Sequence, residues 1–514
     1  MRHVFAAFVF SLATLAAACS YVPTETPESG AMLTPVELSR TAVTPMQAGD
    51  NYYQSAAAAV AARAEGRKVG GAKNIILFVG DGMGISTITA ARIYAGQKRG
   101  QDGESYRLAM ETLPYMALSK TYSHDSQVSD SASTATAMVA GIKSRSRTLG
   151  VTKETAFSNC ASAEGNGTDS LFELAEREGL STGIVSTARI THATPAATYA
   201  ESASRDWEDD TSVRGDCLDI ASQLVAWPEG DGFEVAMGGG RRHFLSKEMG
   251  DPEDGTGARG DGRDLASEWA AKSDDHIAIV NQNGFDTTDF DSDVKVLGLF
   301  EPSHMNYELD RAEDAGGEPS LEALTRAAIT RLSRNEEGYL LMVEGGRIDH
   351  GHHAGNAIRA LEDTDAFDKA VAAALDMTSA NDTLVIVTAD HSHTLTLAGY
   401  PQRNNPILGK VVYPGGTPAM GGDGKPYTSL GYANGPGAAC PPDGPIPCPR
   451  GDLTDVDTTA KDFRQQALVP MGSETHAGED VAVFARGPGA ALIAGVIEQN
   501  EIFHVMGHAS GLVE

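Results

Sequence analysis

Short apolar runs that alternate with helical segments are the feature that most constrains how this chain can fold. Five such runs occupy residues 75–79, 183–185, 339–343, 384–387 and 481–485, and helical stretches at 169–178 and 354–375 lie between them. This alternation predicts an α/β fold, with a large doubly wound central sheet and helices on both of its faces.

Polar side chains follow the ends of three of these runs. Asp81 comes after the first run, Glu344 after the run at 339–343, and Asp390 with His391 after the run at 384–387. In open α/β sheets, ligands bind at the carboxyl ends of the strands. The sequence therefore predicts one functional site to which these separate segments contribute.

The segment 344–353 contains three histidines and two acids within ten residues. Asp349 and His353 are spaced i, i+4, so one helical turn would direct both toward one metal ion. Two further clusters, 388–393 with Asp390 and His391 and 474–480 with His476, support the same interpretation. A lone histidine is more often a surface or core residue, but this density favours a metal site. Mixed histidine and carboxylate ligands favour zinc, and all-oxygen ligands favour magnesium.

Asp130 and Ser131 open an alanine-rich stretch that is predicted to be helical. One interpretation is an ordinary helix N-cap, for which Asp and Ser are well suited. The other is a nucleophile, because backbone N–H groups at a helix N-terminus stabilise a phosphate attached there. A serine hydroxyl needs a metal or a base to become reactive. Arg205 is either a solvated surface residue or a bidentate phosphate ligand.

The N-terminus has the form of an export signal. Arg2 and His3 precede an apolar run at 4–15, and three alanines then lead to Cys19. The run is too short to span a membrane, so we expect residues 1–19 to be a signal peptide. Cleavage is either ordinary or of the lipoprotein type before Cys19, although Ala16 stands where Leu is usual. The expected location is periplasmic, outer-membrane-anchored or extracellular.

Export permits disulfides, and the chain has five cysteines. Cys440 and Cys448 lie close together in a Pro/Gly-rich loop and are expected to pair. Cys160 and Cys217 would form the second pair, which leaves Cys19 unpaired. The formal net charge of −30 disfavours binding to nucleic acid or to anionic membranes.

Local differences in amino-acid composition divide the chain into segments. Residues 20–48 are rich in Pro, Thr, Ser and Glu and are predicted to be a flexible tether, and 50–66 are predicted to form a helix. The main domain is expected at 70–398 and 469–510. The segment 399–468 is dense in Gly, Pro, Asn and Asp, which predicts a loop-rich insertion.

Five motifs, read in chain order, resemble the alkaline phosphatase family. They are FVGDGMG at 78–84, DSA at 130–132, VEGGRIDHGHH at 343–353, TADHSH at 388–393 and ETHAGED at 474–480. The resemblance extends from about residue 51 to 509. It is closer to the animal tissue enzymes than to the commonest bacterial ones, since His192 and His350 stand where many bacterial members carry Asp and Lys.

The resemblance implies hydrolysis of phosphate monoesters through a phosphoserine, with release of inorganic phosphate for scavenging. Ser131 would be the nucleophile, and Arg205 and His350 would contact the substrate. Two zinc ions and one magnesium ion per chain are implied. The first zinc would be held by Asp349, His353 and His476. The second would be held by Asp81, Asp390 and His391, with Ser131 as its fourth ligand in the free enzyme. Magnesium would be held by Asp81, Thr194 and Glu344, with His192 reaching it through water.

The resemblance to the animal enzymes also implies a calcium ion, with Asp216, Glu301, Glu318 and the carbonyl of Phe300 at the matching positions. The insertion at 399–468 resembles the crown subdomain at a homodimer interface, and the helix at 50–66 resembles the arm that embraces the partner.

Two other functions compete with this one. A phosphodiesterase or sulfatase of the same superfamily would differ at the nucleophile. Phosphodiesterases usually use Thr there, and sulfatases need Pro and Arg near a modified Cys or Ser, whereas neither residue lies near Ser131. A non-catalytic phosphate- or metal-binding surface protein is disfavoured because the nucleophile and the implied ligands are all present.

Overall fold

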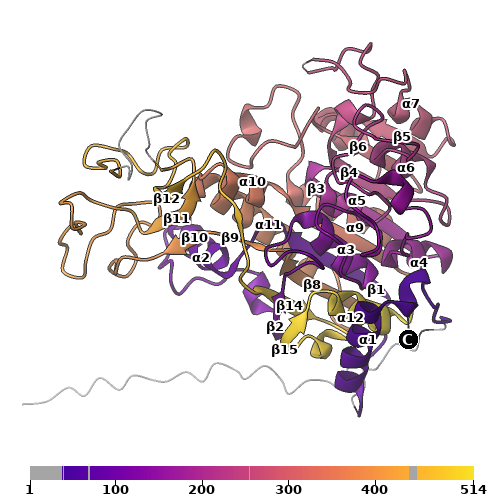
Figure 1. Cartoon of the computed structure of the whole chain (residues 1–514), viewed down its shortest axis with the longest axis horizontal. Helices are drawn as coiled ribbons and strands as arrows, with labels where there is room; N and C mark the ends of the chain where they lie inside the picture. Colours follow the sequence, from indigo (N-terminus) through magenta and orange to yellow (C-terminus); the bar gives the residue numbers. More distant parts are fainter. Residues whose placement is uncertain (1–37, 39, 67–69, 254, 439–448, 514) are drawn as a thin grey trace, which may run out of the picture. The chain divides into compact units, whose positions relative to one another are not determined.

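The computed structural model describes residues 38, 40–66, 70–253, 255–438 and 449–513. Its main feature is a ten-stranded sheet in the order β15-β2-β14-β8-β1-β7-β3-β4-β6-β5 (Figure 1). The strands are β1 (Asn74–Gly80), β2 (Tyr115–Lys120), β3 (Ser181–Arg189), β4 (Val235–Gly239), β5 (His276–Ile279), β6 (Lys295–Leu299), β7 (Tyr339–Gly345), β8 (Thr383–Ala389), β14 (Val481–Arg486) and β15 (Gly495–Glu498).

The strand directions decide which chain segments meet. Only β14 runs antiparallel to the other strands of this sheet, and it pairs with β8 on one side and β2 on the other. Its amino end therefore lies at the edge where the parallel strands have their carboxyl ends. For this reason the segment before β14, which contains His476, reaches the same edge as Asp81, Glu344 and Asp390.

Helices cover both faces of the sheet, as the alternation predicts. The helices are α1 (Asn51–Ala64), α2 (Ile85–Lys98), α3 (Ser131–Ala140), α4 (Leu171–Arg177), α5 (Ala193–Ala196), α6 (Ile220–Ala226), α7 (Leu265–Ala270), α8 (Gln282–Thr287), α9 (Leu321–Leu332), α10 (Arg347–His353), α11 (Ala357–Met377) and α12 (Glu501–Ser510). Successive residues of β1 enter different cores, because side chains alternate between the two faces of a strand. Leu77 packs in the core with α3, α4 and α12, whereas Phe78 packs in the core with α2, α9 and α11.

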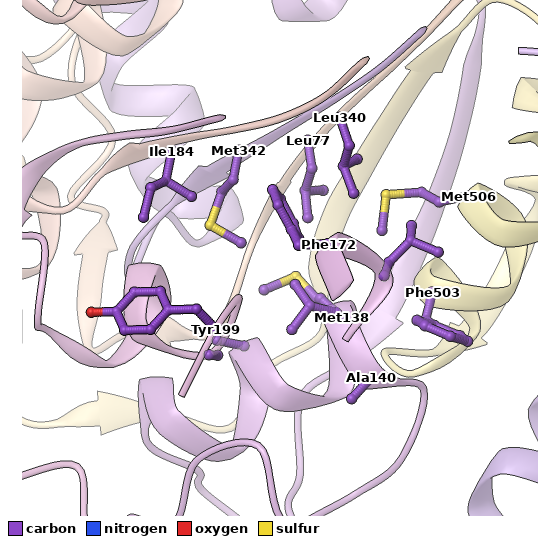
Figure 2. Packing of buried hydrophobic residues seen from close by; sticks show 14 of the residues in the cluster. Leu77, Met138, Ala140, Phe172, Ile184, Tyr199, Leu340, Met342, Phe503 and Met506 are labelled. Atoms are coloured by element: carbon purple, nitrogen blue, oxygen red, sulfur yellow. The ribbon is translucent and has the colours of Figure 1, made fainter. Parts of the chain in front are cut away.

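Figure 2 shows the first of these cores. Leu77, Leu340 and Met342 extend from the strands toward Met138 of α3 and Phe172 of α4. All five side chains are at most 1 % exposed. This packing fixes α3, and thereby its first residue Ser131, against the central strands.

A small sheet joins the insertion to its flanking segments: β11 (Leu430–Gly435) lies within the insertion and pairs with β10 (Leu395–Leu397), which precedes it, and with β12 (Ala467–Pro470), which crosses its end. A separate two-stranded pair joins β9 (Ser392–His393) to β13 (His476–Ala477), so that His393 is the partner of His476. The insertion is therefore tied to segments that carry candidate ligands.

The disulfide between Cys160 and Cys217 is present, with an S–S distance of 2.09 Å, which confirms the predicted pair. Cys19, Cys440 and Cys448 lie outside the described residues, as do the predicted signal peptide and most of the predicted tether. No helix in the described ranges combines the length and apolar character needed to cross a membrane.

A buried carboxyl group on α4 makes stability depend on pH. Glu176 is 3 % exposed and accepts a hydrogen bond from Thr182 Oγ1 at 2.5 Å. Burial, together with the charge of Glu234, raises the pKa of Glu176 to about 8. Because its folded pKa exceeds the unfolded value, Glu176 stabilises the fold at low pH, and this contribution is lost as pH rises toward and through about 8.

We therefore expect Glu176→Gln to be close to native in stability near pH 5. Near pH 9 the variant should be more stable than the native protein, on the order of 1–3 kcal/mol, because the amide has no charge to bury. Denaturant unfolding at both pH values measures this. Glu178→Gln, at the partly exposed end of the same helix, is the control. If the difference in free energy of unfolding between the native protein and Glu176→Gln did not grow from pH 5 to pH 9, the expectation would be wrong.

Candidate active site

The predicted ligands converge at one edge of the sheet in three neighbouring groups. The first metal group is Asp349, His353 and His476; the second is Asp81, Asp390 and His391; the third is Asp81, Thr194 and Glu344, with His192 beside it. Nitrogen and oxygen atoms of Asp349, His353 and His476 lie within 4.8 Å of one another, and so do those of Asp81, His192 and Glu344.

The first metal group depends on α10. Asp349 and His353 lie one turn apart on this helix, as predicted, and the Nε2 atoms of His353 and His476 lie 3.3 and 3.4 Å from Asp349 Oδ1. The other ring nitrogens are fixed by backbone carbonyls. His353 Nδ1 faces Glu474 O at 2.6 Å, and His476 Nδ1 faces Ser129 O at 2.8 Å. Both Nε2 atoms are therefore available to a cation.

The second metal group surrounds the candidate nucleophile. His391 Nε2 lies 3.5 Å from Asp81 Oδ1, 3.2 Å from Asp390 Oδ2 and 3.2 Å from Ser131 Oγ. These four residues are at most 2 % exposed. Gly82, which follows Asp81, has a φ of +69° and donates its N–H to Asp390 at 2.9 Å. A side chain at this position would overlap the ring of His393.

The third metal group is fully buried and rich in oxygen. Among the residues that the structure describes, no hydrogen-bond partner is found for Thr194 Oγ1, one oxygen of Glu344, both oxygens of Asp81 or His192 Nδ1. Ser186 holds the second oxygen of Glu344 through a short hydrogen bond. Buried polar atoms are almost always paired, so this convergence of unpaired acceptors fits divalent cations.

Electrostatics supports the same conclusion. Burial and the charges of Asp390 and Asp349 raise the pKa of Asp81 well above its usual range, and burial raises the pKa of Glu344 to about 7. Several carboxylates packed this closely are unfavourable unless positive charge compensates them. Bound divalent cations would provide that charge.

Ser131 is the first residue of α3, and Asp130 is the N-cap of this helix. The Asp130 side chain accepts a hydrogen bond from the backbone N–H of Ala132 at 3.3 Å. The predicted N-cap is therefore confirmed for Asp130, and Ser131 stands at the helix N-terminus, where the predicted nucleophile would be placed. Arg205 donates to Asp130 Oδ2 at 3.0 Å, and its other arm lies 2.8 Å from His192 Nε2. Its guanidinium group is thus held between the helix cap and the third metal group.

A cluster of three histidines that the sequence did not reveal lies beside Arg205. Nitrogens of His192, His304 and His350 come within 4.8 Å of one another, and Arg189 contacts His304. Burial, together with the charge of Arg205, lowers the pKa of His192 well below its usual range. The guanidinium and imidazole groups that gather here would favour binding of an anion next to the metal groups.

Two more residues gain roles from the structure. His393 and Glu474 belong to motifs noted in the sequence, but nothing in their spacing reveals their contacts. Burial alone would lower the pKa of His393, but hydrogen bonds to Asp349 and Glu474 raise it to about 10. Its side chain is fully buried between these two carboxylates.

The residues predicted for calcium are only partly brought together. Glu301 groups with Glu253 and Asp314, and Asn306 donates to both Glu301 and Glu318, at 2.8 and 2.9 Å. Phe300 is fully buried, directly follows β6 and precedes Glu301. Asp216 is exposed, next to the disulfide-bonded Cys217, and within the described ranges it is not a member of this acidic group.

Comparison with known proteins gives a consistent result. The family model described as alkaline phosphatase matches residues 72–512. The tissue-nonspecific alkaline phosphatase of Gallus gallus is 44 % identical over 458 residues, which cover 85 % of this chain and 84 % of that protein. The Homo sapiens isozyme is 43 % identical over 453 residues, with coverage of 85 % and 84 %.

Solved structures agree. Alkaline phosphatase from Thermus thermophilus matches with a TM-score of 0.62 and 26 % identity, covering 87 % of this chain and 93 % of that one. The enzyme from the Antarctic bacterium TAB5 matches with a TM-score of 0.60 and 25 % identity, covering 86 % and 100 %.

Proposed function

The chain belongs to the alkaline phosphatase family and is an enzyme that hydrolyses phosphate monoesters; we propose that Ser131 is its nucleophile and that Arg205 binds the phosphate. The observation that carries this assignment is the position of Ser131 Oγ, 3.2 Å from His391 Nε2, at the N-terminus of a helix. The same histidine lies next to the buried carboxylate of Asp81, whose oxygens accept no hydrogen bond from the described residues. Neither a simple helix cap nor a passive binding site requires this arrangement.

The family implies divalent metal ions. We propose zinc at the first and second metal groups, because histidines and carboxylates are mixed there, and magnesium at the oxygen-rich third group. When bound, these ions would concentrate positive charge on the transferring phosphoryl group and lower the pKa of coordinated hydroxyl groups.

The chain's own residues then divide the reaction into two steps. Ser131 Oγ forms a bond to phosphorus while the ester oxygen leaves with its electron pair, which gives phosphoserine and an alcohol. Water then attacks phosphorus, releases inorganic phosphate and restores the serine. In both steps the N-terminal N–H groups of α3 and the guanidinium group of Arg205 donate to the phosphate oxygens and hold them in place.

Hydrolysis of p-nitrophenyl phosphate, bis-p-nitrophenyl phosphate and p-nitrophenyl sulfate at alkaline pH tests the proposal. We expect the monoester to be preferred, its hydrolysis to be lost on chelation, and zinc with magnesium to restore it. A preference for the diester or the sulfate would contradict the role of Arg205. Inactivity toward all three would favour a binding protein.

Arg205→Ala separates binding from chemistry. Two charge-assisted hydrogen bonds to phosphate would be lost, so the inhibition constant for inorganic phosphate should rise about 10- to 100-fold, with a smaller change in kcat. Competitive inhibition by phosphate measures this. Arg263→Ala, which removes a partly exposed arginine paired with Glu268, is the control. An unchanged inhibition constant in Arg205→Ala would place Arg205 outside the phosphate site.

Several further properties rest on the resemblance and on the N-terminal sequence. We propose that the enzyme is exported, that it scavenges phosphate from mixed esters, and that it forms a homodimer through α1 and the insertion at 399–468. The mass of the mature N-terminus would distinguish ordinary cleavage from lipidation at Cys19. For calcium we propose Glu301, Glu318 and the Phe300 carbonyl, with Glu253 or Asp314 in place of Asp216.

A further inference from the structure

We propose that Glu474 is a positioning residue that sets how tightly the first metal group (Asp349, His353 and His476) holds its cation. Glu474 is not itself a ligand in this assignment; it acts through the residues that are. The inference rests on the proposed function, because it assumes that these three residues bind zinc.

The carboxylate of Glu474 is fully buried and saturated with donors. Oε1 accepts from the backbone N–H and from the hydroxyl of Thr394, both at 2.6 Å, and Oε2 lies 2.5 Å from His393 Nδ1. A buried charge with three such partners has one well-defined orientation. Glu474 therefore fixes the plane of the His393 ring.

His393 transmits this position to Asp349. Its Nε2 lies 2.7 Å from Asp349 Oδ1, while its Nδ1 faces Glu474. Both ring nitrogens thus face carboxylates, so this ring holds Asp349 in place instead of offering a lone pair to a metal. The result is a continuous Glu474–His393–Asp349 chain of hydrogen bonds.

The main chain of Glu474 fixes the second ligand. Its carbonyl lies 2.6 Å from His353 Nδ1, and its N–H donates to the carbonyl of His353 at 3.0 Å. The Nδ1–H therefore points to Glu474, and His353 Nε2 is left facing Asp349 and His476. A carbonyl that accepts from the other ring nitrogen of a metal-binding histidine fixes both the tautomer and the orientation of the ring.

The third ligand follows two residues later. His476 lies opposite His393 in the β9–β13 pair, so the same ring that Glu474 holds stands next to the strand that carries His476. Asn434 of the insertion binds the intervening Thr475 twice, through its N–H at 3.0 Å and its hydroxyl at 2.9 Å. The segment 474–476 is thereby held from both sides.

The second and third metal groups lack this connection. Within the described part of the chain, the side-chain partners of the Glu474 carboxylate are His393 and Thr394, and neither belongs to those groups. Loss of the Glu474 charge should therefore weaken one zinc site selectively. Losing a residue that holds a metal ligand in place typically lowers metal affinity by about 10- to 100-fold.

Stepwise zinc removal from the holoenzyme tests the proposal. Native protein and Glu474→Gln are equilibrated with increasing dipicolinate, and the zinc retained per chain is measured. We expect one zinc ion to dissociate from Glu474→Gln at a free zinc concentration about 10- to 100-fold higher than in the native protein. The other zinc ion should dissociate at the same free zinc concentration as in the native protein. Excess zinc should restore most of kcat, because all three ligands remain.

Glu479→Gln is the matched control, since Glu479 lies just beyond β13 and accepts from Ser392 Oγ at 2.7 Å, its one side-chain hydrogen bond within the described ranges. Native-like release of both zinc ions from Glu474→Gln would overturn the inference, even with a lower melting temperature. Should that variant fail to fold, Thr394→Val removes one of the three donors and must show a smaller shift of the same single equivalent. A native protein that binds no zinc would instead refute the proposed function.

Discussion

Ser131→Ala is expected to lower turnover of p-nitrophenyl phosphate by a factor on the order of 10³ to 10⁶, the range seen when a covalent nucleophile is removed. In the proposed reaction Ser131 Oγ, which lies 3.2 Å from His391 Nε2, makes the bond to phosphorus, and alanine has no atom that could replace it. The zinc content should stay at two per chain, because the proposed carboxylate and histidine ligands remain. Steady-state kinetics and metal analysis of the same sample measure both quantities.

Ser133→Ala provides the control for this experiment. Ser133 lies two residues along the same helix, and its hydroxyl donates to the backbone carbonyl and side chain of Asp130 at 3.1 and 3.2 Å. Its loss should change turnover only a few-fold. Acid quenching during turnover should trap phosphoserine in the native protein and in Ser133→Ala. Near-native turnover in Ser131→Ala would exclude the covalent route.

The strands that the sequence predicts well are those buried on both faces. The run at 75–79 lies within β1, and the run at 384–387 lies within β8, because a strand covered by helices on both sides is apolar at every position. The acids that follow them are in turn brought together by the parallel arrangement of the strands. Asp81 and Asp390 were therefore predictable as neighbours.

Other features depend on tertiary structure that no local pattern encodes. The reversed direction of β14 brings His476 to the active edge, and this direction is set by pairing with β8 and β2. His304 follows β6 in a loop without any motif, yet packs 4.1 Å from the ring of His350. The folding of the loops brings Glu253 and Asp314 next to Glu301. Sequence position alone could not show that these two acids, and not Asp216, lie beside Glu301.

Asp81→Asn is expected to remove two metal ions at once. Asp81 is proposed to bind in both the second and the third metal group, and neither of its oxygens has a hydrogen-bond partner in the described part of the chain. An amide offers one weak neutral oxygen in place of two anionic ones, so zinc and magnesium sites should both weaken. Turnover should fall by about 10³-fold or more, since positioned positive charge supplies much of phosphoryl-transfer catalysis. Metal analysis and kinetics measure the two effects.

Thr194→Val is the comparison, because Thr194 is proposed to contact only the third metal group. It should lose magnesium and keep two zinc ions. If Asp81→Asn retained two zinc ions and one magnesium ion, Asp81 could not be the shared ligand.

The effect of Asp81→Asn on stability should change sign with metal. In the holoenzyme the variant loses stabilisation from bound ions. Without metal, the native protein must bury Asp81 next to Asp390, Asp349 and Glu344, which together with burial raises the pKa of Asp81 well above its usual range. Because this folded pKa is raised, the metal-free native protein loses stability as pH increases, whereas an uncharged Asn does not. Metal-free Asp81→Asn should thus unfold at a higher temperature than metal-free native protein, most clearly at alkaline pH. A variant less stable than native both with and without metal would show that Asp81 has a structural role independent of cations.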